Sequence, residues 1–317
     1  MKISKKRKNQ CIVVSIFIIL YLFIPTFVTL NMTGTIDTLV PREDIDGRSI
    51  IVEYKNATQS VSVEKFITMV MAARFDISRE VEVLKAESIM IRTDILRIMG
   101  DNLTIDSKDL GMEYYTTSIM RSKWKDDFND NYELIKDCTS STYGLAIKYQ
   151  GKFIDARYTE VSGGTTLSGN DVLGEGHEYM IPVECEKDKE STDYVAVKTI
   201  SNKEFAAAFE KNFDGLTMDK SNLENQVQIA ARSTEGYVQK IQVGNVVMTG
   251  NTFAQILGIN SPNFKLSFMD SGVKVNTVGV GEGMGMSMYT ADYMAKNGAG
   301  YEEILKTFYN DISILCE

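Results

Sequence analysis

The spacing of apolar residues predicts a chain that mixes helices with short strands. Residues 61–73 and 79–99 place apolar side chains three or four positions apart, as in helices that pack on one face, and residues 129–141 predict a third helix. Residues 49–54 are rich in β-branched side chains and predict a strand, and residues 56–60 predict a turn. The first half of the chain is therefore expected to be mainly helical.

The second half of the chain predicts hairpins followed by two closing helices. Residues 145–149 and 153–158 flank a short polar turn, which is a hairpin signal, and residues 237–249 alternate like paired strands. Residues 290–296 and 301–309 predict the last two helices. Helices and antiparallel hairpins mixed in this order predict an α+β fold.

A long apolar run near the N-terminus predicts a single transmembrane helix. Residues 11–30 carry no charge and, at about 1.5 Å per residue, span roughly 30 Å, the thickness of the bilayer interior. Residues 1–10 hold five basic residues and no acid, which predicts a cytoplasmic tail. Residues 31–47 then form a spacer, and residues 48–317 form one extracytoplasmic domain.

A cleaved signal peptide is the alternative interpretation of the same run. Its apolar region would be shorter and would end at a small-x-small site. The run ends instead in Asn-Met-Thr-Gly-Thr, which is a poor cleavage site, so the sequence favours an uncleaved anchor.

Charge and cysteine content argue against two classes of protein. The net charge is −9, and beyond the first ten residues 29 basic and 43 acidic residues leave −14, which argues against a nucleic-acid-binding protein. The chain has 4 cysteines, too few for a disulfide scaffold. Cys138 and Cys185 lie beyond the predicted anchor, and two interpretations remain open: a disulfide between them, or two buried free thiols.

A glycine-rich segment at residues 279–285 precedes a predicted helix. It matches no phosphate-binding motif, and Glu282 in its middle would repel phosphate, so we expect no nucleotide cofactor. We expect either a tight turn that needs small residues or a loop beside an extended ligand. Met284, Met286 and Met288 alternate and predict core positions. His177 is the only histidine, lies in a predicted surface loop, and has no ligand spacing for a metal site around it.

Several motifs together resemble the stage II sporulation protein D family, which includes the amidase-enhancer domains. The resemblance begins in Phe-Ile-Thr-Met-Val-Met-Ala-Ala-Arg-Phe at 66–75 and Val-Leu-Lys-Ala-Glu-Ser-Ile-Met-Ile-Arg-Thr at 83–93. It continues in the segments 149–156, 162–166, 281–287, 291–298 and 301–309. Order and spacing agree over residues 48–317, and the predicted anchor fits the resemblance too.

The resemblance implies a bacterial cell-membrane protein that acts on peptidoglycan outside the membrane, in sporulation and engulfment. It implies glycan strands as the ligand, and a wall amidase and a polytopic membrane protein as partners. We expect no resident cofactor, because the zinc-binding loop of some family members has no counterpart in this sequence. The family's sporulation enzyme resembles a lytic transglycosylase that cuts strands stripped of their peptides. One glutamate there protonates the glycosidic oxygen and then takes the proton of the muramyl 6-hydroxyl.

The chain departs from the family at the positions that carry this chemistry. Arg74 stands where the resemblance places the glutamate, and an arginine cannot exchange a proton at physiological pH. Glu282 stands where the family has a histidine. We therefore expect a catalytically degenerate domain, a pseudoenzyme that keeps a groove for glycan or protein partners. The predicted groove residues are Arg74, Ser162, Gly163, Gly164, Gly281, Glu282, Gly283 and Ser287.

Two alternatives stay open at this point. The first is a diverged peptidoglycan lytic transglycosylase with a relocated acid, either Glu282 or Asp76. The second is a structural interaction protein without wall contact. The paired exchanges at positions 74 and 282 also predict an ion pair between Arg74 and Glu282 across the groove.

Overall fold

The computed structural model describes residues 47–54, 57–220 and 222–317. The predicted cytoplasmic tail, the predicted anchor and the spacer up to residue 46 lie outside these residues. Within the described ranges, none of the helices combines the length and the apolar character needed to cross a bilayer.

The helices follow the order of the chain. They are α2 (Val63–Arg74), α3 (Val81–Met99), α4 (Ser107–Leu110), α5 (Thr117–Trp124), α6 (Phe128–Ser141), α7 (Gly169–Leu173), α8 (Asn202–Asn212), α9 (Gly250–Leu257), α10 (Met288–Lys296) and α11 (Tyr301–Phe308). Short 3₁₀ turns are η2 (Lys125–Asp127), η3 (Glu186–Glu190) and η4 (Leu223–Asn225).

The strands form several small sheets. They are β1 (Ser49–Tyr54), β2 (Ala57–Ser62), β3 (Thr104–Asp106), β4 (Leu145–Tyr149), β5 (Lys152–Phe153), β6 (Tyr158–Thr159), β7 (Val195–Ser201), β8 (Val227–Arg232), β9 (Val238–Val243), β10 (Val246–Met248), β11 (Phe264–Met269), β12 (Gly272–Val278), β13 (Met286–Ser287) and β14 (Ser313–Cys316). The sheet orders are β2-β1-β3, β14-β4-β5, β13-β6, β10-β9-β8 and β11-β12-β7.

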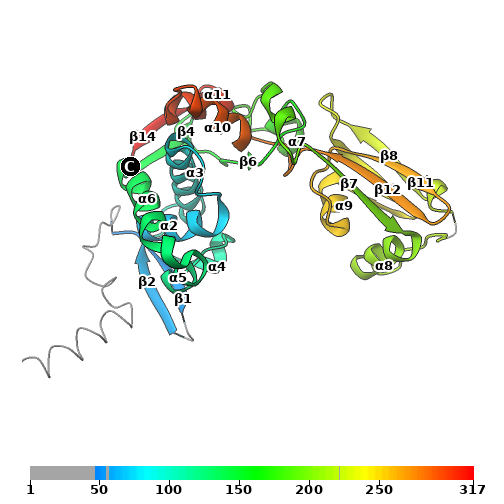
Figure 1. Cartoon of the computed structure of the whole chain (residues 1–317), viewed down its shortest axis with the longest axis horizontal. Coiled ribbons are helices and arrows are strands. Elements are labelled where there is room, and N and C mark those ends of the chain that lie inside the picture. The colour runs from blue at the N-terminus through cyan, green and yellow to red at the C-terminus, as the bar shows by residue number, and fades with distance from the viewer. Residues whose placement is uncertain (1–46, 55–56, 221) are drawn as a thin grey trace, which may run out of the picture.

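These elements gather into two lobes (Figure 1). The helical lobe has two core clusters, and the β lobe has a core of its own. The helical lobe packs α2, α3 and α6 together with the sheet of β1, and α10 and α11 cover the other side of α3. The β lobe holds the sheets of β7–β12 with α8 and α9, around a core that includes Phe205, Phe209 and Phe253. The chain enters the β lobe through β7 and returns from β12 into the glycine-rich segment. That segment therefore lies where the two lobes join.

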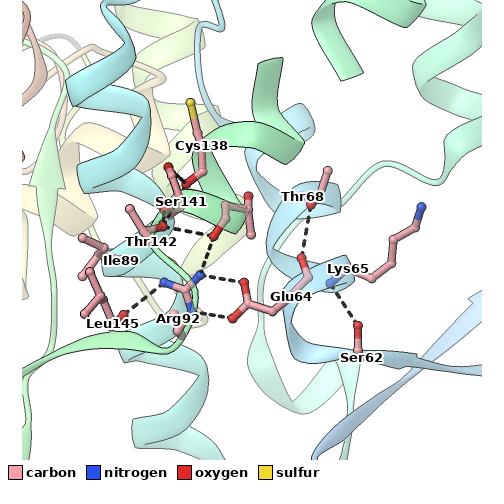
Figure 2. Close-up of polar contacts among 12 residues, drawn as sticks. Ser62, Glu64, Lys65, Thr68, Ile89, Arg92, Cys138, Ser141, Thr142 and Leu145 are labelled. Atoms are coloured by element: carbon pink, nitrogen blue, oxygen red, sulfur yellow. Dashed lines mark hydrogen bonds and ion pairs between the residues drawn. The ribbon is translucent and has the colours of Figure 1, made fainter. Parts of the chain in front are cut away.

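The pairing of α2 with α3 shows how the helical lobe buries charge. Ser62 caps α2 by accepting a hydrogen bond from the backbone N–H of Lys65. Arg92 reaches from α3 to Glu64 on α2, with Nε 2.7 Å from Oε1 and Nη2 2.6 Å from Oε2 (Figure 2). Arg92 also donates to the carbonyls of Leu145 and Thr139. This ion pair joins α2, α3, α6 and β4 inside the core.

The mixed α+β fold is confirmed, and one local prediction is wrong. Of the segment predicted as a turn at 56–60, residues 57–60 lie within β2, which pairs antiparallel with β1, and residue 56 lies outside the described residues. Most β2 side chains are exposed, so no apolar alternation marks this strand in the sequence. The predicted hairpin at 145–158 is present as β4 and β5, but β6 leaves it and pairs in parallel with β13.

Candidate functional site

Strand β6 separates two groups of charged side chains. Successive residues of a strand point to opposite sides. Tyr158 and Glu160 point toward the end of α2 and the loop that follows it, where they contact Arg74 and Arg79. Arg157 and Thr159 point the other way, where they contact the glycine-rich segment. Arg74 and Glu282 therefore lie on opposite sides of β6.

Arg74 occupies the α2 side of this site. It is the last residue of α2 and its side chain is exposed. Its Nε donates to the hydroxyl of Tyr158 at 3.2 Å, and its guanidinium lies 5.0 Å from the centre of the Tyr158 ring. Among the described residues, no carboxylate lies within ion-pair distance of Arg74. The guanidinium therefore lies on an aromatic surface with its remaining N–H donors toward solvent.

Three charged residues lie beside Arg74. Arg79 pairs with Glu160 (Nη2 to Oε2, 2.5 Å), and its Nε lies 3.9 Å from Oε1 of Glu87, too far for a hydrogen bond. Both carboxyl oxygens of Glu87 are buried without a hydrogen-bond partner, and so is Nε of Arg79. Burial raises the pKa of Glu87 well above its usual range, and burial also raises the pKa of Glu160 despite the opposing charge of Arg79. Two carboxyls thus share one arginine.

The structure does not favour Asp76 as a proton donor. The backbone N–H of Ser78 donates to its Oδ1 at 3.0 Å. The hydrogen bonds from Ser78 hold the pKa of Asp76 below its ordinary value, and Arg79 lowers it further. Asp76 therefore forms the turn between α2 and α3 as an ionised carboxylate.

Glu282 is fixed on the opposite side of β6. Arg157 donates to its Oε2 at 3.0 Å, and Asn251 donates to its Oε1 at 2.6 Å. The predicted ion pair between Arg74 and Glu282 is therefore wrong: Glu282 pairs with Arg157. The alternation of side chains along β6 explains this, because Arg157 and Tyr158 point to opposite sides and each takes one of the two partners.

The two predicted groove serines lie in the interior instead of at the surface. Ser162 and Ser287 are fully buried and both bind the carboxylate of Asp188. The N–H of Ser162 donates at 2.5 Å, the hydroxyl of Ser287 at 2.7 Å, and the hydroxyl of Thr290 at 2.6 Å. Asp188, which the sequence did not single out, therefore holds three segments together and occupies the backbone N–H of Ser162 and the hydroxyl of Ser287.

The glycines of the predicted groove serve close backbone packing. Gly283 and Gly285 both have positive φ, and a Cβ would strike the Tyr237 ring at the first and the carbonyl of Arg157 at the second. Gly163 donates its N–H to the Tyr237 hydroxyl at 2.7 Å, Gly164 is buried, and Gly281 lies against Thr159. The tight-turn interpretation of the segment fits these contacts. Met284, Met286 and Met288 are buried, as the alternation predicts.

The cysteines are not bonded to each other. Cys138 and Cys185 are buried free thiols in separate core clusters, so the disulfide that the sequence left open is absent from the structure. Burial raises the pKa of each thiol to about 11, which keeps both protonated.

No metal site and no second site emerge around the predicted residues. In the part of the chain that the structure describes, no group of three His, Cys, Asp or Glu side chains could hold a metal ion. A hollow of about 260 Å³ lies between hairpin β4–β5 and the loop around His177, and none of the predicted groove residues lines it. The charged cluster beside Arg74 is therefore the candidate site.

Comparison with known proteins supports the resemblance. No family model matches the chain. The chain is 28% identical over 277 residues to stage II sporulation protein D of Bacillus subtilis (strain 168), which covers 82% of this chain and 77% of that protein. It is 26% identical over 267 residues to the protein of the same name from Bacillus amyloliquefaciens, covering 82% and 76%.

A third relative has no assigned role. It is an uncharacterized protein of Brachyspira hyodysenteriae, 26% identical over 262 residues, which cover 80% of this chain and 67% of that protein. The two Bacillus relatives and the shared length establish that the chain is homologous to stage II sporulation protein D over about four fifths of its length.

Proposed function

We propose that this chain is a membrane-anchored wall protein of the sporulation type, whose extracytoplasmic domain binds peptidoglycan glycan strands at the site beside α2 and β6. Homology to stage II sporulation protein D over 82% of the chain supports this role. The site is degenerate at position 74, because Arg74 cannot exchange a proton there.

The exposed guanidinium of Arg74 is the single observation that carries the proposal. An amidase that removes the stem peptide from a muramyl residue leaves a free lactyl carboxylate on the strand. An arginine that lies on an aromatic ring and has N–H donors free for a carboxylate suits such a group. Arg74 on Tyr158 has this arrangement. The ligand class is therefore peptide-stripped glycan, and a wall amidase is the partner that would supply it.

A binding experiment tests this function. The full-length chain in detergent is mixed with peptide-stripped strands or with strands that keep their peptides, and the bound fraction is measured by co-sedimentation. We expect preference for stripped strands, and a roughly tenfold loss in Arg74→Gln, since one charge-assisted hydrogen-bonding group is removed. Arg74→Lys should lose less, because it keeps the charge.

Arg121 provides a matched control. It is also exposed and lies over an aromatic ring, 4.1 Å from the centre of Phe128, but it belongs to α5. Arg121→Gln should bind stripped strands as the wild type does. Equal binding by Arg74→Gln and the wild type, or equal binding of both kinds of strand, would contradict the proposed role.

A further inference from the structure

The cluster beside Arg74 contains a carboxyl suited to the chemistry that position 74 has lost. Glu160 and Glu87 face the same arginine from two different parts of the chain, the bend that follows β6 and the middle of α3. The side chain of Glu160 is 37% exposed, whereas that of Glu87 is 0% exposed. Of the two, only Glu160 can touch a strand bound at the surface.

We infer that Glu160 is the proton-transfer residue of this site, positioned and controlled by Arg79 and Glu87. The inference rests on the proposed glycan binding and adds a reaction to it. Glu160 lies between the resembling segments 149–156 and 162–166 and outside the α2 motif that carries the implied glutamate, so its role is a relocation within the site.

The contacts of Arg79 explain how a paired carboxylate becomes an acid. Arg79 bonds Glu160 through Nη2, while its unpartnered Nε lies 3.9 Å from Glu87. A shift of about 1 Å toward Glu87 would bring Nε to hydrogen-bond distance of that carboxyl. Arg79 would then neutralise Glu87 as a carboxylate, and Glu160, no longer paired, would hold a proton. Arg79 thus changes its partner from Glu160 to Glu87, and the proton is then held by Glu160 instead of Glu87.

The remaining charged groups around Glu160 favour its protonated form. Asp76 adds a negative charge from the α2–α3 turn, and burial acts in the same direction. Arg79 opposes both while it remains paired with Glu160. Arg74 and Tyr158 border the same face from α2 and β6. A strand bound on Arg74 would further exclude water from Glu160.

The reaction is the transglycosylation that the resemblance implies, and it balances without a co-reactant. Glu160 donates its proton to the glycosidic oxygen as the bond from that oxygen to the muramyl C1 breaks. The Glu160 carboxylate then takes the proton of the muramyl 6-hydroxyl as that oxygen bonds to C1. The products are a 1,6-anhydromuramyl end, a free sugar hydroxyl and the regenerated acid.

Two glutamates provide a matched comparison. Glu160 and Glu282 flank β6 on opposite sides, each pairs with one arginine, and their side chains are 37% and 39% exposed. The full-length chain in detergent is incubated with peptide-stripped strands, and new 1,6-anhydro ends are counted by mass spectrometry. We expect the wild type to produce new 1,6-anhydro ends. Glu160→Gln should produce at least 100-fold fewer of them, and Glu282→Gln should still produce them.

A second variant reports on the positioning residues. Glu87→Gln cannot become a carboxylate, so Arg79 stays on Glu160 and the alkaline limb of the pH–rate profile should move to lower pH. A purely structural Glu87 would leave that limb in place. Glu160→Asp, which keeps a carboxyl, should retain some activity and guards against loss of folding in Glu160→Gln.

The outcomes separate this inference from the proposed function. Stripped strands that bind without new ends would overturn the assignment of Glu160 and leave glycan binding intact. Ends that persist in Glu160→Gln and vanish in Glu282→Gln would place the acid on the other side of β6. If the chain neither binds stripped strands nor produces new 1,6-anhydro ends, both proposals are overturned.

Discussion

Helices α2 and α3 bury two glutamates in opposite ways. Glu64 accepts two hydrogen bonds from Arg92, whose other donors reach carbonyls of α6 and β4 (Figure 2). Glu87, on the same helix as Arg92, is fully buried and both of its oxygens lack a partner. A buried carboxyl without hydrogen bonds is costly, so folding alone does not account for Glu87. The first glutamate stabilises the lobe, and the second faces Arg79, the arginine that pairs with Glu160.

The largest effect on stability is expected at the Glu64–Arg92 pair, in which both oxygens of the buried carboxylate have hydrogen-bond partners. Arg92→Met leaves the Glu64 carboxylate buried without its partner and removes the donors to Leu145 and Thr139. Breaking a buried ion pair in this way costs about 3–5 kcal/mol of unfolding free energy. Urea unfolding measures the loss. Arg97→Met, on the same helix at a partly exposed position, should cost less than about 1 kcal/mol. Similar losses of unfolding free energy in Arg92→Met and Arg97→Met would contradict the special role of the buried Arg92–Glu64 pair.

An intermediate effect is expected at Asp188, the buried carboxylate that binds Ser162, Ser287 and Thr290. Asp188→Asn places an NH₂ group against at least one of these donors. The loss should be about 2–3 kcal/mol, the range for hydrogen bonds to a charged group. Thermal unfolding measures it, with exposed Asp193→Asn as the control. A loss below 0.5 kcal/mol, on the order of a surface substitution, would show that the three contacts contribute little.

An effect of opposite sign is expected at Glu87. Its folded pKa lies above the unfolded value of 4.5, so below pH 4.5 both states carry the proton and nothing is lost. As the pH rises above that value, only the unfolded chain releases its proton, and wild-type stability falls by at most about 1.4 kcal/mol per pH unit. Glu87→Gln lacks this loss, so its advantage should grow between pH 5 and pH 8, roughly the range of protein stability maxima.

Unfolding at several pH values checks the sign. A Glu87→Gln variant that is less stable than the wild type, with a deficit that grows as the pH rises, would mean that Glu87 is an ionised and paired carboxylate. That result would contradict the contrast with Glu64.

Much of the fold could be predicted from apolar spacing, because α2, α3, α6, α10 and α11 each bury one face. Strand β2 could not, since it is a polar edge strand. The partner of Arg74 could not be predicted either. Strand β6 has only two residues, and the alternation of side chains along it decides that Arg74 contacts Tyr158 and Glu282 contacts Arg157. The sequence pattern does not single out Glu160, Glu87 or Asp188 as site residues. One signal was present: Glu87 falls on the apolar face of α3, between Leu84 and Ile91.

The most direct test is a titration of the carboxyl carbons by ¹³C NMR with glutamate-selective labelling of the full-length chain in detergent. Glu87→Gln and Glu160→Gln assign the two signals. We expect that Glu87 titrates well above 4.5, that Glu160 also titrates above 4.5, and that each substitution shifts the midpoint of the other glutamate. Two independent midpoints near 4.5 would show that no proton is shared, and the contrast between the two buried glutamates would fail.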